Sequence, residues 1–456
     1  MYLHLLININ FLHFQLIIIF IQYEEDVFMK KRLVAVLLVA AMSMSLLTAC
    51  RDSGESQATV DIEQTDYDPE EAVKDFEFGD LTDEEKNYTV EMGYNNCDHM
   101  VAAIIGEKAG IYKALGLNVN VTKSGETVKA LVSGAMDVGY IGVGAAALSQ
   151  NPPYFIAAAN HTGGSRYLVV SNDITEPSQI EGKTIAMTST PEGNSEWRAW
   201  ARDYNVSFNA EDYNIVSMGQ QDAMFALKAG QIDGFVCCDP YASIAEFEGF
   251  GHIMFTSWGI NMPEDGSLPG SDDWARCCAL AMNKDFAEQH PELARRLVYA
   301  HMLSIKYLYE HPYNASMMFA DGFDCDPYVG LRTVYMKTVA EGRTITWHWS
   351  QANLQNDEDF DTQFTNPSII ETDISYVSIF EDSLKRATEL ADSAKLDDFD
   401  EYIKEKVDPI SPLGITFEDW YEHAKTIDGI SDEDAVDISK TATPYLNENV
   451  EGTDKK

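Results

Sequence analysis

The sequence predicts an α/β fold of two similar lobes followed by a helical extension, and three observations predict it. The chain has 456 residues, enough for two lobes with appendages. An A-L-x-x-G-x-x-D pattern at 130–137 recurs at 226–233. In each copy, a helix is expected to end on the glycine, which adopts positive φ easily, and the aspartate leads into a strand. Both copies stand among alternating strand and helix patterns, which is typical of α/β folds.

The other elements follow from apolar runs and from the residues that interrupt them. Strands are expected at 88–94, 118–121, 138–141, 166–170, 184–187 and 235–238, and helices at 98–108 and 195–203. From Asn283 onward the pattern is helical, Pro291 allows only a brief kink, and one face carries Phe286, Leu293, Leu297, Ile305 and Leu308. The segment 345–456 is predicted to be an acidic helical extension with a stripe of Leu384, Ala387, Leu390 and Ala391.

The charge of the chain excludes some classes of partner. Lys and Arg number 32 against 74 Asp and Glu, which gives a formal net charge of −42. Such a surface repels phosphate backbones and anionic headgroups, so we expect no nucleic acid and no peripheral membrane binding. We interpret the negative charge as a property that keeps the protein soluble outside a cell.

The N-terminal region predicts an extracytoplasmic location. Lys30 to Arg32 precede an apolar run from Leu33 to Leu47, the charge and length of a signal peptide. The run ends in Leu-Thr-Ala-Cys50, which resembles the bacterial lipobox, so 29–50 is the expected signal peptide and Cys50 the expected lipidation site. One short transmembrane helix with a chance cysteine is the alternative. Because Met29 directly precedes the lysines, residues 1–28 are interpreted as a start-site artefact.

The next segment and the cysteines complete the organisation. Residues 51–87 are rich in acids and poor in large apolar side chains, which predicts a disordered tether. No C-x-x-C pair and no Cys/His zinc spacing occurs, so we expect no metal site. The neighbouring Cys237 and Cys238 should face opposite sides of a strand. The cysteines beyond Cys50 are therefore interpreted as structural: Cys97, Cys237, Cys238, Cys277, Cys278 and Cys325.

The motifs of common enzymes are missing, so we predict a binding protein without a cofactor. There is no G-x-S-x-G, P-loop, G-x-G-x-x-G or H-E-x-x-H. In open α/β sheets, ligands gather at the carboxyl ends of strands, where helix N-termini can bind an anion. Those ends supply the candidate ligand-binding residues: Asn95, Asn96, His99, Ser124, Gly125, Gly142, Gly144, Ala145, His161, Gly163, Gly164, Arg166, Thr188, Asn194 and Asp239.

Several candidates have a structural interpretation as well. His99 and His161 can be hydrogen-bonded structural histidines, and Asn95-Asn96 a turn pair. Trp197, which lies in the same region, is more often a core residue than a stacking platform. Asp239-Pro240 can start a helix with the aspartate as its cap.

Residues 88 to about 313 resemble the family of periplasmic binding proteins for nitrate, sulfonates, taurine and related compounds, named for a thiamine-pyrimidine synthase homologue. The motifs are AAIIGEKAGIYKALGLNVNV, SGETVKALVSGAMDVGYIGVGAA, GKTIAMTST, KAGQIDGFVCCDPYA and NKDFAEQHPELARRL. The resemblance implies the two-lobed periplasmic-binding-protein fold of type II, with a ligand cleft between the lobes and docking to an ABC permease. It places lobe 1 at 88–165 and 276–344 and lobe 2 at 166–275. It carries ligand contacts over to 124–125, 142–145 and 163–166.

Departures from that family leave the solute open. Taurine-type relatives often carry an acid where Arg166 stands, and an arginine there favours a carboxylate, sulfonate or phosphonate. Asp239 could pair with an amine, which makes a zwitterion plausible, or it could pair with Arg166 and bind nothing. The expected protein is a monomeric, lipid-anchored importer component. The alternatives are a thiamine-pyrimidine precursor binder or related enzyme, which in yeast uses a Cys-rich run with a histidine and pyridoxal phosphate, and a surface solute sensor.

Overall fold

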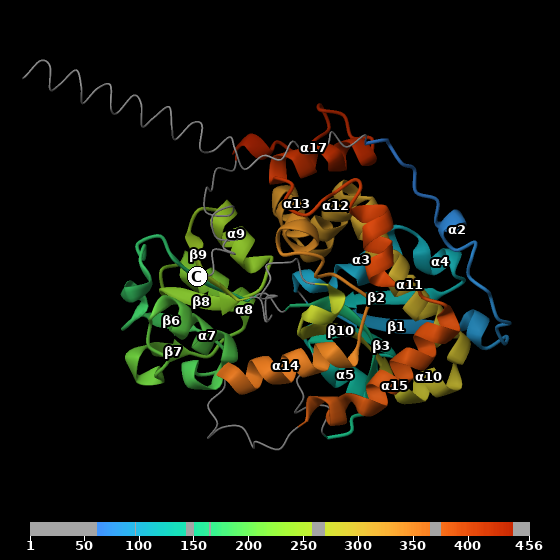
Figure 1. Ribbon diagram of the computed structural model, residues 1–456, viewed down its shortest axis with the longest axis horizontal. Coiled ribbons are helices and arrows are strands. Elements are labelled where there is room, and N and C mark those ends of the chain that lie inside the picture. Colours follow the sequence, from blue (N-terminus) through green and yellow to red (C-terminus); the bar gives the residue numbers. More distant parts are fainter. Residues whose placement is uncertain are drawn as a thin grey trace, which may run out of the picture. The chain divides into compact units, whose positions relative to one another are not determined.

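In the computed structural model, the strands form two separate five-stranded sheets. The structure describes residues 62–95, 97–142, 150–163, 166–257, 270–364 and 375–440, all within one compact unit that starts at Ile62. Figure 1 shows the second sheet and its helices, in green, beside the first sheet. We call each sheet with its own helices a lobe.

The first sheet combines the early strands with a returning strand from later in the chain. Its order is β2 (Asn118–Lys123), β1 (Thr89–Tyr94), β3 (Val138–Gly142), β10 (Arg276–Asn283) and β4 (Tyr154–Thr162). β1 runs parallel to β2 and β3, and β10 runs antiparallel to both β3 and β4. Its helices are α3 (Val101–Lys108), α4 (Ile111–Ala114), α5 (Thr127–Ser133), α10 (Lys284–Gln289), α11 (Pro291–Glu310) and α12 (Pro312–Phe323).

The second sheet is built from one continuous stretch of chain. Its order is β7 (Asn214–Val216), β6 (Thr184–Ala186), β8 (Gly234–Cys237), β5 (Arg166–Ser171) and β9 (Gly251–Ser257). β6 is parallel to β7 and β8, and β5 is antiparallel to β8 and β9. The helices α7 (Ser195–Tyr204), α8 (Gln220–Lys228) and α9 (Tyr241–Phe247) flank it (Figure 1).

The repeated A-L-x-x-G-x-x-D pattern is confirmed as a pair of equivalent helix–strand connections. Gly134 follows α5 with φ 72°, and Gly230 follows α8 with φ 67°. Each glycine is in the left-handed conformation, which a residue with a Cβ adopts only under strain. The chain then enters β3 in one lobe and β8 in the other, so both copies lead into the central strand of their sheet.

The expected brief kink at Pro291 is wrong, because two helices meet there. α10 ends at Gln289, and His290 has a non-helical backbone with φ −127° and ψ 60°. Pro291 then takes the first position of α11, where its missing N–H costs no hydrogen bond. The apolar face expected on this stretch is confirmed, since Phe286, Leu293 and Leu297 are all buried.

The expected tether is wrong for residues 62–87, which pack against lobe 1. This arm contains α2 (Pro69–Ala72), and it buries Val73 and Phe76 in the core of that lobe. Arg296 of α11 donates a 2.8 Å hydrogen bond to the carbonyl of Gly79. A few apolar side chains are enough to fix the arm, because they pack against residues that lie far along the chain. The local excess of acidic residues does not reveal these distant partners. Residues 1–61, with the expected signal peptide and Cys50, lie outside the described residues.

The C-terminal extension is part of lobe 1 and covers one face of its sheet. It comprises α14 (Gln351–Phe364), α15 (Tyr376–Ala394), α16 (Phe399–Tyr402) and α17 (Phe417–Ile427). Leu354 and Phe380 are fully buried against β4 and β10, and Ser383 Oγ accepts a 3.3 Å hydrogen bond from the backbone of β4. The predicted stripe on α15 is confirmed, with Ala387 buried and Leu384 partly buried. Among the described residues, no helix has the length and apolarity that a membrane span needs.

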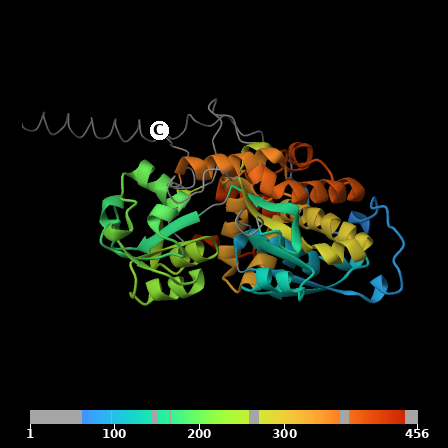
Figure 2. The same ribbon diagram turned by 90° about the horizontal axis from the view of Figure 1, so that it is seen from below.

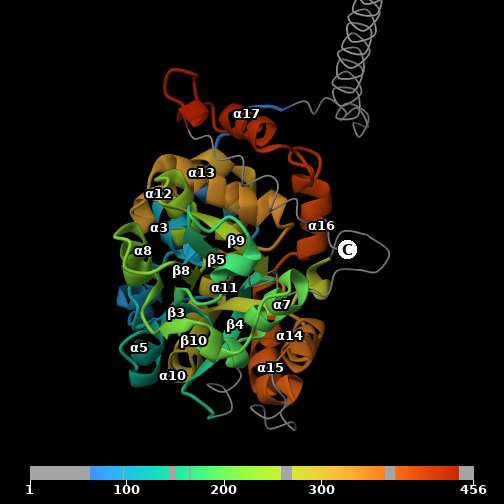
Figure 3. The same cartoon turned by 90° about the vertical axis from the view of Figure 1, so that its left-hand side faces the viewer.

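Two segments from outside lobe 2 reach its surface. α14 lies against both α7 and α15, as Figure 3 shows. α13 (Pro327–Tyr335) and the π-helical turn η7 (Met336–Ala340) follow α12, yet Met336 belongs to the core of lobe 2. Arg332 forms a buried ion pair with Glu246 of α9. Residues 327–341, which the sequence assigns to lobe 1, therefore pack between the lobes.

Short turns complete the secondary structure. The second π-helical turn is η8 (Ile403–Val407). The 3₁₀ turns are η1 (Glu85–Asn87), η2 (Asp98–Met100), η3 (Pro177–Ile180), η4 (Pro191–Gly193), η5 (Ala210–Asp212), η6 (Ser271–Asp273) and η9 (Ile438–Lys440). Figure 2 shows the whole fold from below, with the orange helical segments lying over the sheets.

Candidate functional site

The candidate residues of lobe 1 lie at one edge of its sheet. β1, β2 and β3 run in the same direction, and β4 shares it because both β3 and β4 are antiparallel to β10. Their carboxyl ends therefore meet at one edge, together with the first residues of β10. The candidates at this edge are Asn95, His99, Ser124, Gly125, Gly142, His161 and Gly163.

The candidate residues of lobe 2 also share an edge. Arg166 begins β5, which is antiparallel to β8, so it lies at the edge where β6 and β8 end. Thr188 follows β6, and Asp239 follows β8. The edges of the two lobes touch: Cys97 Sγ, just beyond β1, is 3.1 Å from Cys238 Sγ, just beyond β8.

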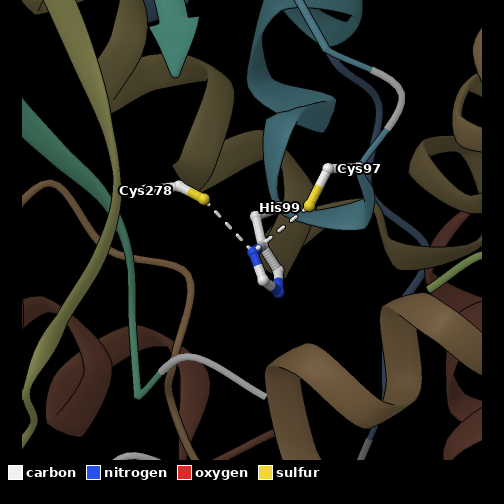
Figure 4. Close-up of side chains that lie close together, drawn as sticks. All are labelled: Cys97, His99 and Cys278. Carbon is white, nitrogen blue, oxygen red and sulfur yellow. Dashed lines mark hydrogen bonds between the residues drawn. The ribbon is translucent and has the colours of Figure 1, made fainter. Parts of the chain in front are cut away.

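Thiols and imidazoles fill the place where these edges meet. His99 Nδ1 lies 3.5 Å from Cys97 Sγ and 3.4 Å from Cys278 Sγ, as Figure 4 shows. It is also 3.6 Å from Cys277 Sγ. Cys277 and Cys278 are neighbours in β10, and their sulfurs are 3.5 Å apart. One imidazole nitrogen is thus surrounded by three thiols.

A β-bulge explains how two consecutive cysteines reach the same site. Successive side chains of a regular strand point to opposite faces. The pairing of β10 with β4 is shifted between Arg276 and Cys278 and again between Cys278 and Ala279. Such irregularities re-aim side chains and are common beside functional sites.

His161 stacks on His99 deep in the same site. Their rings are 3.6 Å apart at the centroids and 4° from parallel. His161 is fully buried, and burial lowers its pKa to about 4, with the charge of His99 acting in the same direction. Among the described residues, neither of its ring nitrogens completes a hydrogen bond of ordinary geometry. The neutral ring is therefore the form present at neutral pH.

Arg166 supplies positive charge beside the thiols. Its pKa is raised although burial alone would lower it, because Cys238, Glu196, Cys277 and Cys97 favour the charged guanidinium. The hydrogen bond from Cys278 lowers the pKa of Cys277 well below its ordinary value, and the same interaction raises the pKa of Cys278. The site can thus hold a thiolate next to a guanidinium, an arrangement that sequence spacing did not reveal.

Other candidates have clear structural roles. Both carboxylate oxygens of Asp239 accept hydrogen bonds from Ser243, at 2.9 Å from its backbone N–H and 2.8 Å from its hydroxyl. Asn194 caps α7 by accepting from Trp197 N at 2.6 Å. Trp197 is fully buried in the core of lobe 2, as its structural interpretation predicts. Asp239 and Asn194 therefore orient helices at the edge of the site.

The remaining candidates are positioned by turns and strand ends. Ser124 Oγ accepts from Glu126 N at 3.1 Å, which shapes the turn before α5. A Cβ at Gly125 or Gly142 would meet no atom of the described residues within 4 Å, so these glycines border space that the described part of the chain leaves open. Asn95 Oδ1 is buried without a hydrogen-bond partner among the described residues. Asn96, Gly144, Ala145 and Gly164 lie outside the described residues.

Sequence reasoning missed the cysteines of this site. Cys97, Cys238, Cys277 and Cys278 were interpreted as structural, yet they all border the place where the lobes touch. The expectation that Cys237 and Cys238 face opposite sides is confirmed, since Cys237 is in the core of lobe 2 while Cys238 contacts Cys97. Their position in the sequence could have identified them as site residues, because each lies at or near the end of a strand on the candidate edge.

Comparison with known proteins gives the family. The model of the NMT1-like family matches residues 83–320, which is more than half of the chain. The taurine-binding periplasmic protein of Escherichia coli K12 is 27% identical over 171 residues, which cover 37% of this chain and 49% of that protein. The chain thus spans about half the length of this curated relative.

Two solved structures of binding proteins are similar to this chain. The periplasmic nitrate-binding protein NrtA of Synechocystis PCC 6803 matches with a TM-score of 0.52 at 15% identity, over 74% of this chain and 98% of that chain. The alkanesulfonate-binding protein SsuA of Xanthomonas axonopodis pv. citri, bound to MOPS, gives a TM-score of 0.46 at 15% identity, over 60% and 92%. The chain belongs to the NMT1-like family and has the two-lobed α/β fold of periplasmic binding proteins.

Proposed function

We propose that this protein is the extracytoplasmic, lipid-anchored solute-binding component of an ABC importer. It captures a small anionic or zwitterionic solute between its lobes and delivers it to the permease subunits as a monomer. The observation that carries the proposal is that the ligand-bearing edges of both sheets meet at the contact between Cys97 and Cys238, with Arg166 beside it. The NMT1-like family and the taurine-binding relative support the solute class.

Arg166 is the residue that we expect to recognise the solute. The protein as a whole repels anions, with a formal net charge of −42. A guanidinium offers a planar pair of donors that matches a sulfonate or carboxylate. The carboxylate of Asp239 is engaged by Ser243 in the first turn of α9, whose N-cap residue is Pro240. An anionic solute therefore fits beside Arg166 better than a cationic solute.

Calorimetric titration of the full chain, purified in mild detergent, tests the solute class. We expect taurine, an alkanesulfonate or nitrate to bind, and Arg166→Ala to weaken binding about ten- to a hundredfold, since hydrogen bonds to charged groups are worth about 1.5–3 kcal/mol. Arg202→Ala is the matched control, because Arg202 is exposed and paired with Asp203. A change below about threefold for Arg166→Ala would contradict its role.

The membrane anchor and the closing motion need separate tests. Cys50→Ser should release the protein from membranes or block its processing, and unchanged membrane association with unchanged mature mass would contradict lipidation. Saturating solute should lower the radius of gyration in X-ray scattering, because lobes that close around a solute become more compact. Binding without compaction would contradict closure.

A further inference from the structure

The arrangement of thiols around His99 has the dimensions of a metal site. Zn²⁺ binds thiolate sulfur at about 2.3 Å and imidazole nitrogen at about 2.0–2.1 Å in tetrahedral geometry. Two such ligands are then separated by about 3.6 Å for nitrogen and sulfur and about 3.8 Å for two sulfurs. The distances from His99 Nδ1 to the three sulfurs are 3.5, 3.4 and 3.6 Å, and the Cys277–Cys278 pair is at 3.5 Å. Four ligand edges thus approach the tetrahedral values, whereas Cys97 and Cys277 belong to separate groups of mutually close ligand atoms, so a tetrahedral ion draws these two sulfurs closer together.

The ligand atoms come from rigid parts of lobe 1. Cys97 and His99 flank the start of η2, which continues into α3, and the cysteine pair sits in β10. Asn160 Nδ2 of β4 donates to the backbone carbonyl of His99, which holds the histidine segment against the sheet. Arg276, directly before the pair, is ion-paired at 2.5 Å to Asp357 of α14. These contacts position His99 and the cysteine pair before any ion binds.

Burial of the proposed ligands and the surroundings of the neighbouring His161 support a bound ion at this site. His99 and Cys278 are 2% and 5% exposed. His161, stacked on His99, is 0% exposed, and its ring nitrogens complete no hydrogen bond of ordinary geometry with the described residues, although the Cys277 thiol interacts with the ring. Buried polar atoms in native proteins are nearly always paired, and an unpaired group calls for a water or an ion. Cys97 and Cys277 are only partly buried, which leaves a route from outside.

We propose that Cys97, His99, Cys277 and Cys278 bind a thiophilic divalent metal ion of the Zn²⁺ class, with His99 coordinating through Nδ1. Three sulfurs and one imidazole are the soft ligand set that selects such ions over Mg²⁺ or Ca²⁺. Cys238 of lobe 2 lies 3.1 Å from Cys97, so the ion sits where the lobes touch. Metal binding is measured without any solute, so this inference stands or falls separately from the transport role.

The experiment loads the full chain, kept reduced and in mild detergent, with Zn²⁺ and removes the excess by dialysis. Elemental analysis should find about one zinc ion per chain, and Co²⁺ in its place should give the thiolate-to-metal absorbance of a tetrahedral site. Cys278→Ser, Cys97→Ser and His99→Ala should each weaken binding at least about tenfold in competition with a chromophoric chelator. Cys325→Ser is the matched control and should keep wild-type affinity, since Cys325 belongs to neither group of clustered ligands.

A second measurement avoids variants that fail to fold. In wild-type protein, Zn²⁺ should protect Cys97, Cys277 and Cys278 from alkylation, while labelling of Cys325 stays the same. The proposal is overturned if wild type retains no zinc, or if mass spectrometry of the unreduced, metal-free protein finds Cys97 bonded to Cys238. It is also overturned if His161→Ala loses the ion and Cys97→Ser keeps it, because the alternative group of His99, His161 and Cys277 would then hold it.

Discussion

Asp137 and Asp233 make the same pair of hydrogen bonds in the two lobes. The carboxylate of Asp137 accepts from Glu91 N at 2.9 Å, and its own N–H donates to Glu91 O at 2.9 Å. The carboxylate of Asp233 accepts from Thr184 N at 2.8 Å, and its N–H donates to Thr184 O at 2.9 Å. Each aspartate thus joins the entry of one parallel strand to its neighbour. This contact is the physical reason why the A-L-x-x-G-x-x-D pattern ends in an aspartate in both lobes.

Replacing either aspartate should cost stability, and replacing Asp137 should cost more because it also accepts from Tyr88 OH at 2.9 Å. Asp137→Ala and Asp233→Ala each leave a strand N–H without its acceptor, so we expect a loss of about 1–2 kcal/mol in the free energy of unfolding. Asp137→Asn and Asp233→Asn should cost less, because the amide oxygen still accepts. Urea denaturation of the four variants measures this. Equal losses for Ala and Asn would show that the hydrogen bond is not the cause.

Local sequence signals predicted the helices and strands of the lobes well, because each of these elements depends on residues that are close together in the chain. The helix, the glycine at positive φ and the strand after it lie within about a dozen residues, which is the range over which propensity and patterning act. The pairing of Asp137 with Glu91 is a contact between separate elements, and no spacing rule contains it. The family motifs then implied how the elements divide between lobe 1 and lobe 2.

The site and the arm show where such reasoning ends. The sulfurs around His99 come from segments near residues 97 and 277, and a bulge in β10 turns two neighbours toward one point. Metal patterns read from sequence require ligands at short, regular spacing, so this group was invisible to them. The burial of Phe76 likewise depends on Tyr299, whose ring is 4.6 Å away in space but far along the chain.

His301 should make the stability of lobe 1 sensitive to acid. It is buried between β3, β4 and α11, where Tyr140 OH lies 3.0 Å from Nδ1 and Ala159 O lies 2.6 Å from Nε2. The ring therefore donates to the carbonyl and accepts from the tyrosine, which suits its neutral form. Burial lowers the pKa of His301 to about 4, while the Ala159 carbonyl acts weakly in the opposite direction.

The sign of the effect follows from the two pKa values. The unfolded chain, with the ordinary value of 6.5, binds the proton between pH 6.5 and 4, and the folded chain does not. The stabilisation is complete above pH 6.5 and is lost as the pH falls toward 4. Between pH 7 and 5, we expect His301 to account for about 2 kcal/mol of the decline in unfolding free energy. His301→Gln should flatten the pH profile by that amount, and parallel profiles would contradict the assignment.

The buried pair of Lys337 and Glu341 should be costly to break. Lys337 Nζ lies 3.0 and 2.8 Å from the two carboxylate oxygens, and Tyr167 OH donates to the carboxylate at 2.6 Å. Glu341→Gln leaves the ammonium buried without its counter-charge, so we expect a loss of about 3–5 kcal/mol. The double variant Lys337→Met/Glu341→Gln should recover most of it. Guanidinium denaturation decides, and equal losses for the single and double variants would rule out charge as the cause.

Phe76 and Phe78 form a matched pair for testing whether residues 62–87 are a packed arm. Phe76 is 5% exposed and lies between the guanidinium of Arg295, at 4.4 Å, and the ring of Tyr299, whereas Phe78 is 50% exposed. Phe76→Ala should cost about 3 kcal/mol, because it opens a cavity on lobe 1. Phe78→Ala should cost less than about 1 kcal/mol. If the arm were a free tether, neither change would alter the midpoint of urea unfolding; a shift confined to Phe76→Ala requires that the arm folds with the lobe.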